Sequence, residues 1–63
     1  LPLNYRPWGA LPDNTKVEFI KWYSTEKRAL NAAKKIAKKC AYVVGYQAVE
    51  WGEKIDNKKW IAI

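Results

Sequence analysis

Histidine and methionine are absent from this chain of 63 residues, and Cys40 is its single cysteine. Without histidine there is no imidazole to act as a catalytic base or as a metal ligand. One cysteine excludes an internal disulfide, and we expect Cys40 to be a small buried side chain. The lack of methionine, together with a bulky Leu1, also predicts that Leu1 is not the translated start.

Long apolar runs and glycine-rich loops are missing as well. The longest strongly apolar stretch, residues 40–46, is far shorter than the roughly 20 residues that span a bilayer. Gly9, Gly45 and Gly52 are isolated from one another, so the sequence has no loop of the kind that holds phosphates. Apart from Glu26, the acidic residues fall on an expected arm, on strands and on a turn rather than across a cleft, and the sequence has no spacing typical of metal ligands. We therefore expect a cytoplasmic protein that is not an enzyme and has no cofactor, metal or membrane partner.

Residues 1–15 hold all three prolines of the chain, at a spacing of five. Proline removes a backbone donor and biases the preceding residue toward extended geometry, which disfavours a helix or a central strand. We expect residues 1–15 to form an extended arm rich in proline and aromatic residues, followed by a single domain over residues 16–63. Pro12, Asp13 and Asn14 predict a turn.

The rest of the chain alternates between strand and helix patterns. Residues 16–23 and 41–51 are rich in β-branched and aromatic residues and predict strands, as does the shorter stretch 59–63. We expect Asp56-Asn57 at the tip of a hairpin between the last two strands. Residues 25–40 predict a helix, which gives the order β-α-β-β. The expected fold is α+β, a small domain with one amphipathic helix packed on a three-stranded sheet. If the first two strands pair in parallel, their crossover is right-handed.

The helical stretch has two different faces. Ser24 or Thr25 can cap its N-terminus, and Glu26 suits the positive end of the helix dipole. One stripe at helical spacing is apolar and consists of Ala29, Leu30, Ala33, Ile36, Ala37 and Cys40. The opposite arc is polar and consists of Lys27, Arg28, Asn31, Lys34, Lys35, Lys38 and Lys39. Because alanine dominates the apolar stripe, the helix should lie close against the sheet.

Nearly all of the net charge of +6 comes from this helix. Six cations and one anion lie between Glu26 and Cys40, a net of +5, which leaves +1 for the rest of the chain. A polar face built only for solubility would intersperse both signs of charge. We therefore predict a non-catalytic module that binds DNA or RNA through the phosphate backbone. The expected contacts are Lys27, Arg28, Lys34, Lys35, Lys38, Lys39 and Arg6.

Two other interpretations of the charged face stay open. It can be merely solvated, or it can steer the protein toward an acidic protein partner. The chain also has nine aromatic residues, more than one helix can cover, and exposed Trp and Tyr anchor many protein interfaces. The alternative function is a small protein–protein interaction module, such as an inhibitor of a host enzyme or a subunit of an assembly. Its expected contacts are Tyr5, Trp8, Trp22 and Tyr46, and the apolar edge at residues 59–63 offers pairing with a second copy.

Two resemblances are partial. Residues 45–51, GYQAVEW, resemble the RNP1 strand of the RNA-recognition motif. The matching positions are Gly45, Tyr46, Val49 and Trp51. Val44 replaces the basic residue of that motif and Ala48 replaces a phenylalanine, and the chain lacks the second helix of that family, so no family assignment follows. In architecture alone, the β-α-β-β plan is similar to small phage-encoded proteins that bind and inhibit a host enzyme, which would make this a viral protein.

Overall fold

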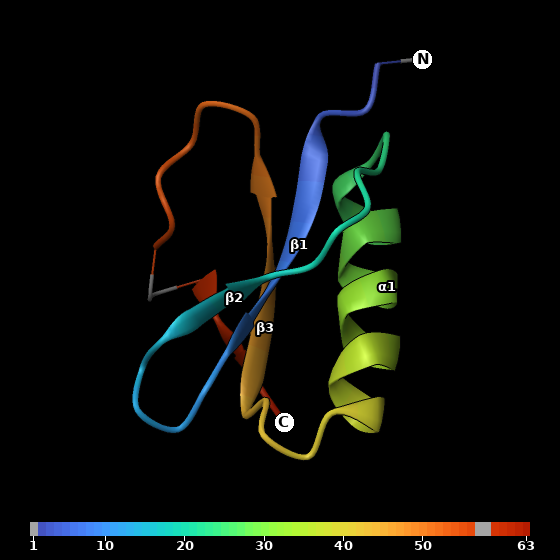
Figure 1. The fold of residues 1–63 in the computed structure, drawn as a ribbon. Coiled ribbons are helices and arrows are strands. Elements are labelled where there is room, and N and C mark those ends of the chain that lie inside the picture. Colours follow the sequence, from blue (N-terminus) through green and yellow to red (C-terminus); the bar gives the residue numbers. More distant parts are fainter. Residues whose placement is uncertain (1, 57–58) are drawn as a thin grey trace.

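The computed structural model describes residues 2–56 and 59–63, in which four antiparallel strands form a sheet with one helix on one face (Figure 1). The strands are β1 (Tyr5–Ala10), β2 (Lys16–Glu18), β3 (Gly45–Glu50) and β4 (Ile61–Ala62), and the helix is α1 (Glu26–Lys39). Across the sheet the order is β2-β1-β3-β4. The predicted α+β class and the predicted helix are confirmed.

The N-terminal segment belongs to the sheet, and the expectation of an arm that is not a central strand is wrong. All six residues of β1 pair antiparallel with β3. The other edge of β1 pairs antiparallel with β2, with Gly9 opposite Val17. The sheet therefore has four strands in place of the three expected, and β1 lies at its centre.

Pro7 is tolerated inside this central strand because its missing N–H would point toward the segment between Glu18 and Tyr23, which does not pair regularly with β1. The Pro7 carbonyl accepts a hydrogen bond from the Phe19 backbone N–H at 3.1 Å, so both backbone positions of Pro7 point away from β3. On that side the partner segment bulges. Tyr5 and Trp8 are three positions apart on β1, whereas their partners Tyr23 and Glu18 are five positions apart, so the segment opposite β1 holds two extra residues. The proline thus leaves the β1–β3 ladder intact.

The same bulge shortens the strand expected at residues 16–23 to Lys16–Glu18. Tyr23 then returns to the sheet in a bridge with Tyr5, through two backbone hydrogen bonds of 2.9 and 2.7 Å. In the described part of the chain all strand pairs are antiparallel and β1 separates β2 from β3, so the parallel pairing considered above does not form. β3 and β4 pair antiparallel as expected, and Asn57 at the predicted tip lies outside the described residues.

α1 lies close against the sheet because the side chains between them are small. The hydroxyl of Thr25 caps the helix and accepts a hydrogen bond from the Arg28 backbone N–H at 3.2 Å. Ala29, Ala33 and Ala37 are buried against the sheet. The three alanines of the predicted apolar stripe therefore face inward, whereas Leu30, Ile36 and Cys40 are half-buried, so the expectation that Cys40 is buried is wrong.

Gly9 is part of the same tight packing. A Cβ at this position would lie 2.8 Å from the Phe19 ring and 3.1 Å from the side chains of Val17 and Val43. These three side chains fill the space that a residue larger than glycine would need. Apart from Pro7, the buried apolar residues of the described chain are all alanine or valine: Ala10 on β1, Ala29, Ala33 and Ala37 on α1, Val43 before β3 and Val49 on β3.

The predicted turn at residues 12–14 joins β1 to β2. Asn14 has a φ of 69°, a left-handed conformation that asparagine tolerates. The Asp13 Oδ1 atom accepts a hydrogen bond from the Thr15 backbone N–H at 2.9 Å. Hydrogen bonds from Thr15 stabilise the carboxylate and lower the pKa of Asp13.

Candidate nucleic-acid interface

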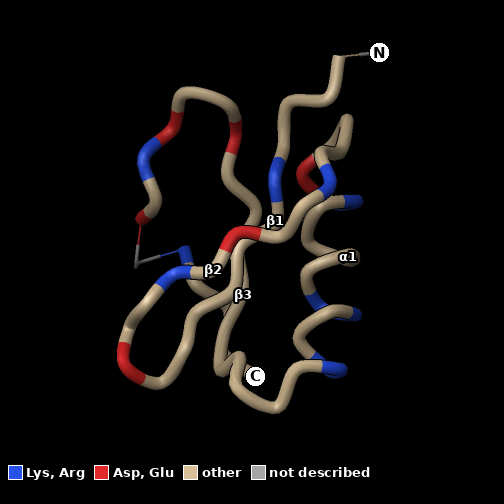
Figure 2. The backbone as a smooth tube through the Cα atoms, viewed as in Figure 1, with Lys and Arg blue, Asp and Glu red and all other residues tan. Residues whose placement is uncertain are grey.

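Six cations cover the side of α1 that faces away from the sheet (Figure 2). Helical spacing gathers them on one arc, and all six side chains are exposed. They are Lys27, Arg28, Lys34, Lys35, Lys38 and Lys39, and together they are called the cationic face below. Lys38 and Lys39 also lie in the last turn, where positive charge stabilises the helix dipole.

The cationic face has no anionic partner within the part of the chain that the structure describes. Arg6–Glu18 and Lys59–Glu53 are ion pairs on other elements. On α1, pairs such as Lys34 and Lys38 stand four residues apart, where like charges repel at a cost of about 0.2–0.5 kcal/mol per pair. An anion that bound here would relieve that repulsion.

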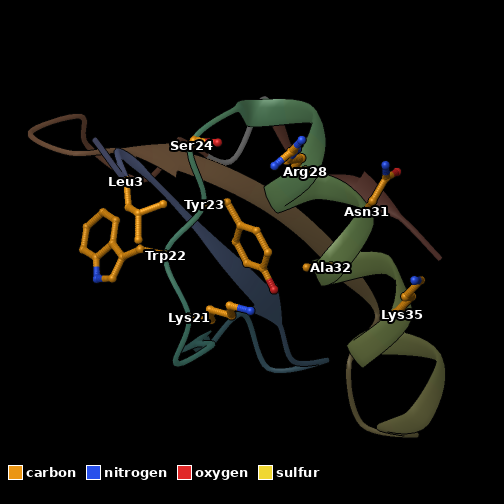
Figure 3. A pocket seen from close by; sticks show the side chains of 9 residues that line it. All are labelled: Leu3, Lys21, Trp22, Tyr23, Ser24, Arg28, Asn31, Ala32 and Lys35. Atoms are coloured by element: carbon orange, nitrogen blue, oxygen red, sulfur yellow. The ribbon is translucent and has the colours of Figure 1, made fainter. Parts of the chain in front are cut away.

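A groove of about 470 Å³ lies between one flank of the cationic face and residues 21–24, and we call it the α1 groove (Figure 3). It joins three cations and an amide to aromatic and apolar side chains. Its walls are Leu3, Lys21, Trp22, Tyr23, Ser24, Arg28, Asn31, Ala32 and Lys35. The remaining cations of α1 lie outside the groove.

The bulge opposite β1 builds the outer wall of this groove. Two extra residues displace the chain between Glu18 and Tyr23, which leaves the Ile20 side chain 95% exposed. The bridge to Tyr5 then fixes the Tyr23 backbone, and the Tyr23 ring points toward α1 (Figure 3). The Nζ atom of Lys21 stands 5.7 Å from the centre of that ring.

Arg6 was predicted to join the nucleic-acid contacts, but the fold does not bring it to the cationic face. Tyr5 bridges Tyr23 on the helix side, and alternation along β1 therefore turns Arg6 to the opposite side of the sheet. There its guanidinium forms an ion pair with Glu18 and lies 4.1 Å from the centre of the Trp22 ring.

The predicted partner contacts are divided between the two sides of the sheet. Tyr5 and Tyr46 stand on the helix side by alternation, and the Glu50 carboxylate is the main cause of the raised pKa of Tyr5. Trp8 stands on the opposite side by alternation. Trp22 borders the α1 groove, and its ring lies against the Arg6 guanidinium on that opposite side. All four side chains are half-buried, so none is a freely exposed anchor.

Three residues that the sequence did not single out as contacts occupy prominent positions. Trp51 is 76% exposed, and its ring centre lies 5.4 Å from that of Trp22. Lys21 and Tyr23 line the α1 groove. The exposure of Trp51 could have been predicted from its position next to the turn at Gly52. The positions of Lys21 and Tyr23 could not, because they depend on the bulge opposite β1.

The described residues contain no group of His, Cys, Asp or Glu side chains arranged to hold a metal ion. Within the same ranges, no helix is both long and apolar enough to cross a membrane. Comparison of the chain with protein-family models, with curated proteins and with solved structures found no match.

Proposed function

We propose that this protein is a nucleic-acid-binding module that contacts the phosphate backbone through the cationic face of α1. The observation that carries the proposal is a set of six exposed cations on one helix arc with no anionic partner in residues 2–56 and 59–63. Phosphates would replace the mutual repulsion of these side chains with attraction and release condensed counterions. The Ala-rich inner face of α1 is buried against the sheet, so the cationic face is directed away from the sheet.

The proposal predicts binding that depends steeply on salt. A fluorescently labelled 12-mer of random sequence, single-stranded or duplex, should bind in 50 mM salt and dissociate as salt rises. If at least four phosphates are contacted, the slope of log K against log salt should be about −3 or steeper. Polarisation titrations at four salt concentrations measure this slope. No binding in 50 mM salt, or a slope shallower than about −1, would refute the proposal.

A second candidate, docking on a protein partner, is favoured by a different surface. Leu3, Trp22 and Trp51 surround a shallow hollow of about 480 Å³ together with Asn4 and Arg6. Leu3 and Trp51 are exposed, and exposed tryptophan is typical of the anchors that dominate protein interfaces. The partner would be acidic, because the protein carries a net charge of +6 and would be steered toward negative charge.

If this second candidate is correct, Trp51→Ala should weaken capture of an acidic partner by about 30-fold, as loss of a hot-spot residue does. Tyr42→Ala is the matched control, because Tyr42 is 77% exposed and lies outside this hollow. Affinity capture from the native source followed by titration of the purified partner measures both variants. Equal losses for the two variants would contradict a specific role of Trp51.

A further inference from the structure

The α1 groove has a composition that phosphate binding alone does not require. Beside the cations it presents the Tyr23 ring, the apolar side chains of Leu3 and Ala32, and the Asn31 amide. A surface that only tracks phosphates needs positive charge, whereas this one also offers a flat aromatic ring and an amide that can both donate and accept hydrogen bonds. The volume of about 470 Å³ lies within the range of small-ligand sites.

The cations of the groove are placed on both sides of its aromatic part. Arg28 and Lys35 are seven residues apart on one flank of α1, which separates them by roughly 10 Å along the helix axis. Lys21 approaches from the opposite wall, with its Nζ 5.7 Å from the centre of the Tyr23 ring. Figure 3 shows Tyr23 between these walls, directed toward α1. A ligand that places its planar part on Tyr23 would therefore have positive charge on either side.

We propose that the α1 groove binds single-stranded nucleic acid, with one unpaired base against Tyr23 and the adjacent phosphates on Arg28 and Lys35. This inference rests on the proposed function and names the class of nucleic acid. In a duplex the faces of the bases are stacked and only their edges are accessible from the grooves. An unpaired base presents its face, and stacking on an aromatic side chain stabilises such complexes without demanding a particular sequence. Asn31 also lines this groove.

A free nucleotide offers the same base and phosphate, but it has no neighbouring phosphates. The strand can engage the groove and the rest of the cationic face at once, whereas the mononucleotide engages the groove alone. We therefore expect the strand to bind far more tightly than the mononucleotide. A comparable affinity for the two would assign the groove to a free nucleotide and overturn the proposal for a strand.

The test uses a thymidine 12-mer that carries one 2-aminopurine, the same label in a 12-bp duplex, and 2-aminopurine mononucleotide, each in 50 mM salt. The single strand should bind at least tenfold more tightly than the duplex, and its 2-aminopurine fluorescence should be quenched by stacking. Tyr23→Leu should weaken strand binding by about tenfold and abolish the quenching, with little effect on the duplex. Tyr23→Phe, which keeps the ring, should retain both signals, and Tyr42→Leu outside the groove should behave as the wild type.

Ala32→Leu supplies a second variant that does not depend on Tyr23. The added side chain would narrow the groove from the helix side without changing charge, so strand binding should fall and duplex binding should not. Equal affinity for strand and duplex, or unchanged strand binding by folded Tyr23→Leu and Ala32→Leu, would overturn the groove proposal. Duplex binding with a steep salt dependence would leave the proposed function standing in that case. Absence of binding to either form would refute both.

Discussion

Exchanging Lys34 and Lys38 for glutamate is expected to weaken nucleic-acid binding by about 100-fold in 50 mM salt. Each lost phosphate contact lowers the salt slope by about 0.7 for a single strand, which corresponds to about tenfold in affinity at this salt concentration. The two lysines lie one helix turn apart on the cationic face and outside the α1 groove. Both are exposed, so the fold should persist. Polarisation titrations at several salt concentrations measure the affinity and the slope together.

The matched control is the exchange of Lys54 and Lys59 for glutamate. Both double variants lower the net charge from +6 to +2, so any effect of overall charge is the same. Lys54 and Lys59 are exposed and belong to the segment between β3 and β4, which lies on the other side of the sheet from α1 (Figure 1). We expect the control to lose only a few-fold in affinity. If the two double variants lose affinity equally, nonspecific attraction to a basic protein explains the binding and the cationic face is not the interface.

The helix and its charge could be predicted from the sequence because both depend on residues close together in the chain. The 3.6-residue pattern predicted the burial of Ala29, Ala33 and Ala37, and Thr25 was one of two candidates for the cap. The hydrogen bond from the Arg28 N–H to the Thr25 hydroxyl is also local. Local signals of this kind carry over to the structure when the interactions that satisfy them lie within one or two helix turns.

The centre of the sheet and the α1 groove could not be predicted, because they depend on pairing between distant segments. Pro7 argues against a central strand unless the segment opposite bulges, and nothing near Pro7 reveals that bulge. Arg6 is a free cation in the sequence, yet the register of β1 against β2 places it beside Glu18. Tyr23 was part of an expected strand, and only the bridge to Tyr5 turns its ring toward α1. The registers of these pairings are tertiary information that composition and periodicity do not contain.

Ala33→Leu is expected to lower the free energy of unfolding by about 2–3 kcal/mol, because overpacking a tight interface forces backbone shifts. Ala33 is fully buried in the face of α1 that packs on the sheet. A domain of this size has a total stability of only about 3–9 kcal/mol, so the loss is a large fraction of it. The melting temperature followed by circular dichroism should fall by about 10–20 °C.

Lys34→Leu is the control for this substitution, since it adds the same side chain to the neighbouring helix position, on the exposed arc. Leucine and lysine have similar helix propensities, so its free energy of unfolding should change by less than about 0.5 kcal/mol. A melting temperature of Ala33→Leu within about 3 °C of the wild type would mean that the helix–sheet contact yields to a larger side chain. In that case the position of α1 would not be fixed by small residues, and the α1 groove, which has α1 as one of its walls, would have no rigid width for a base to occupy.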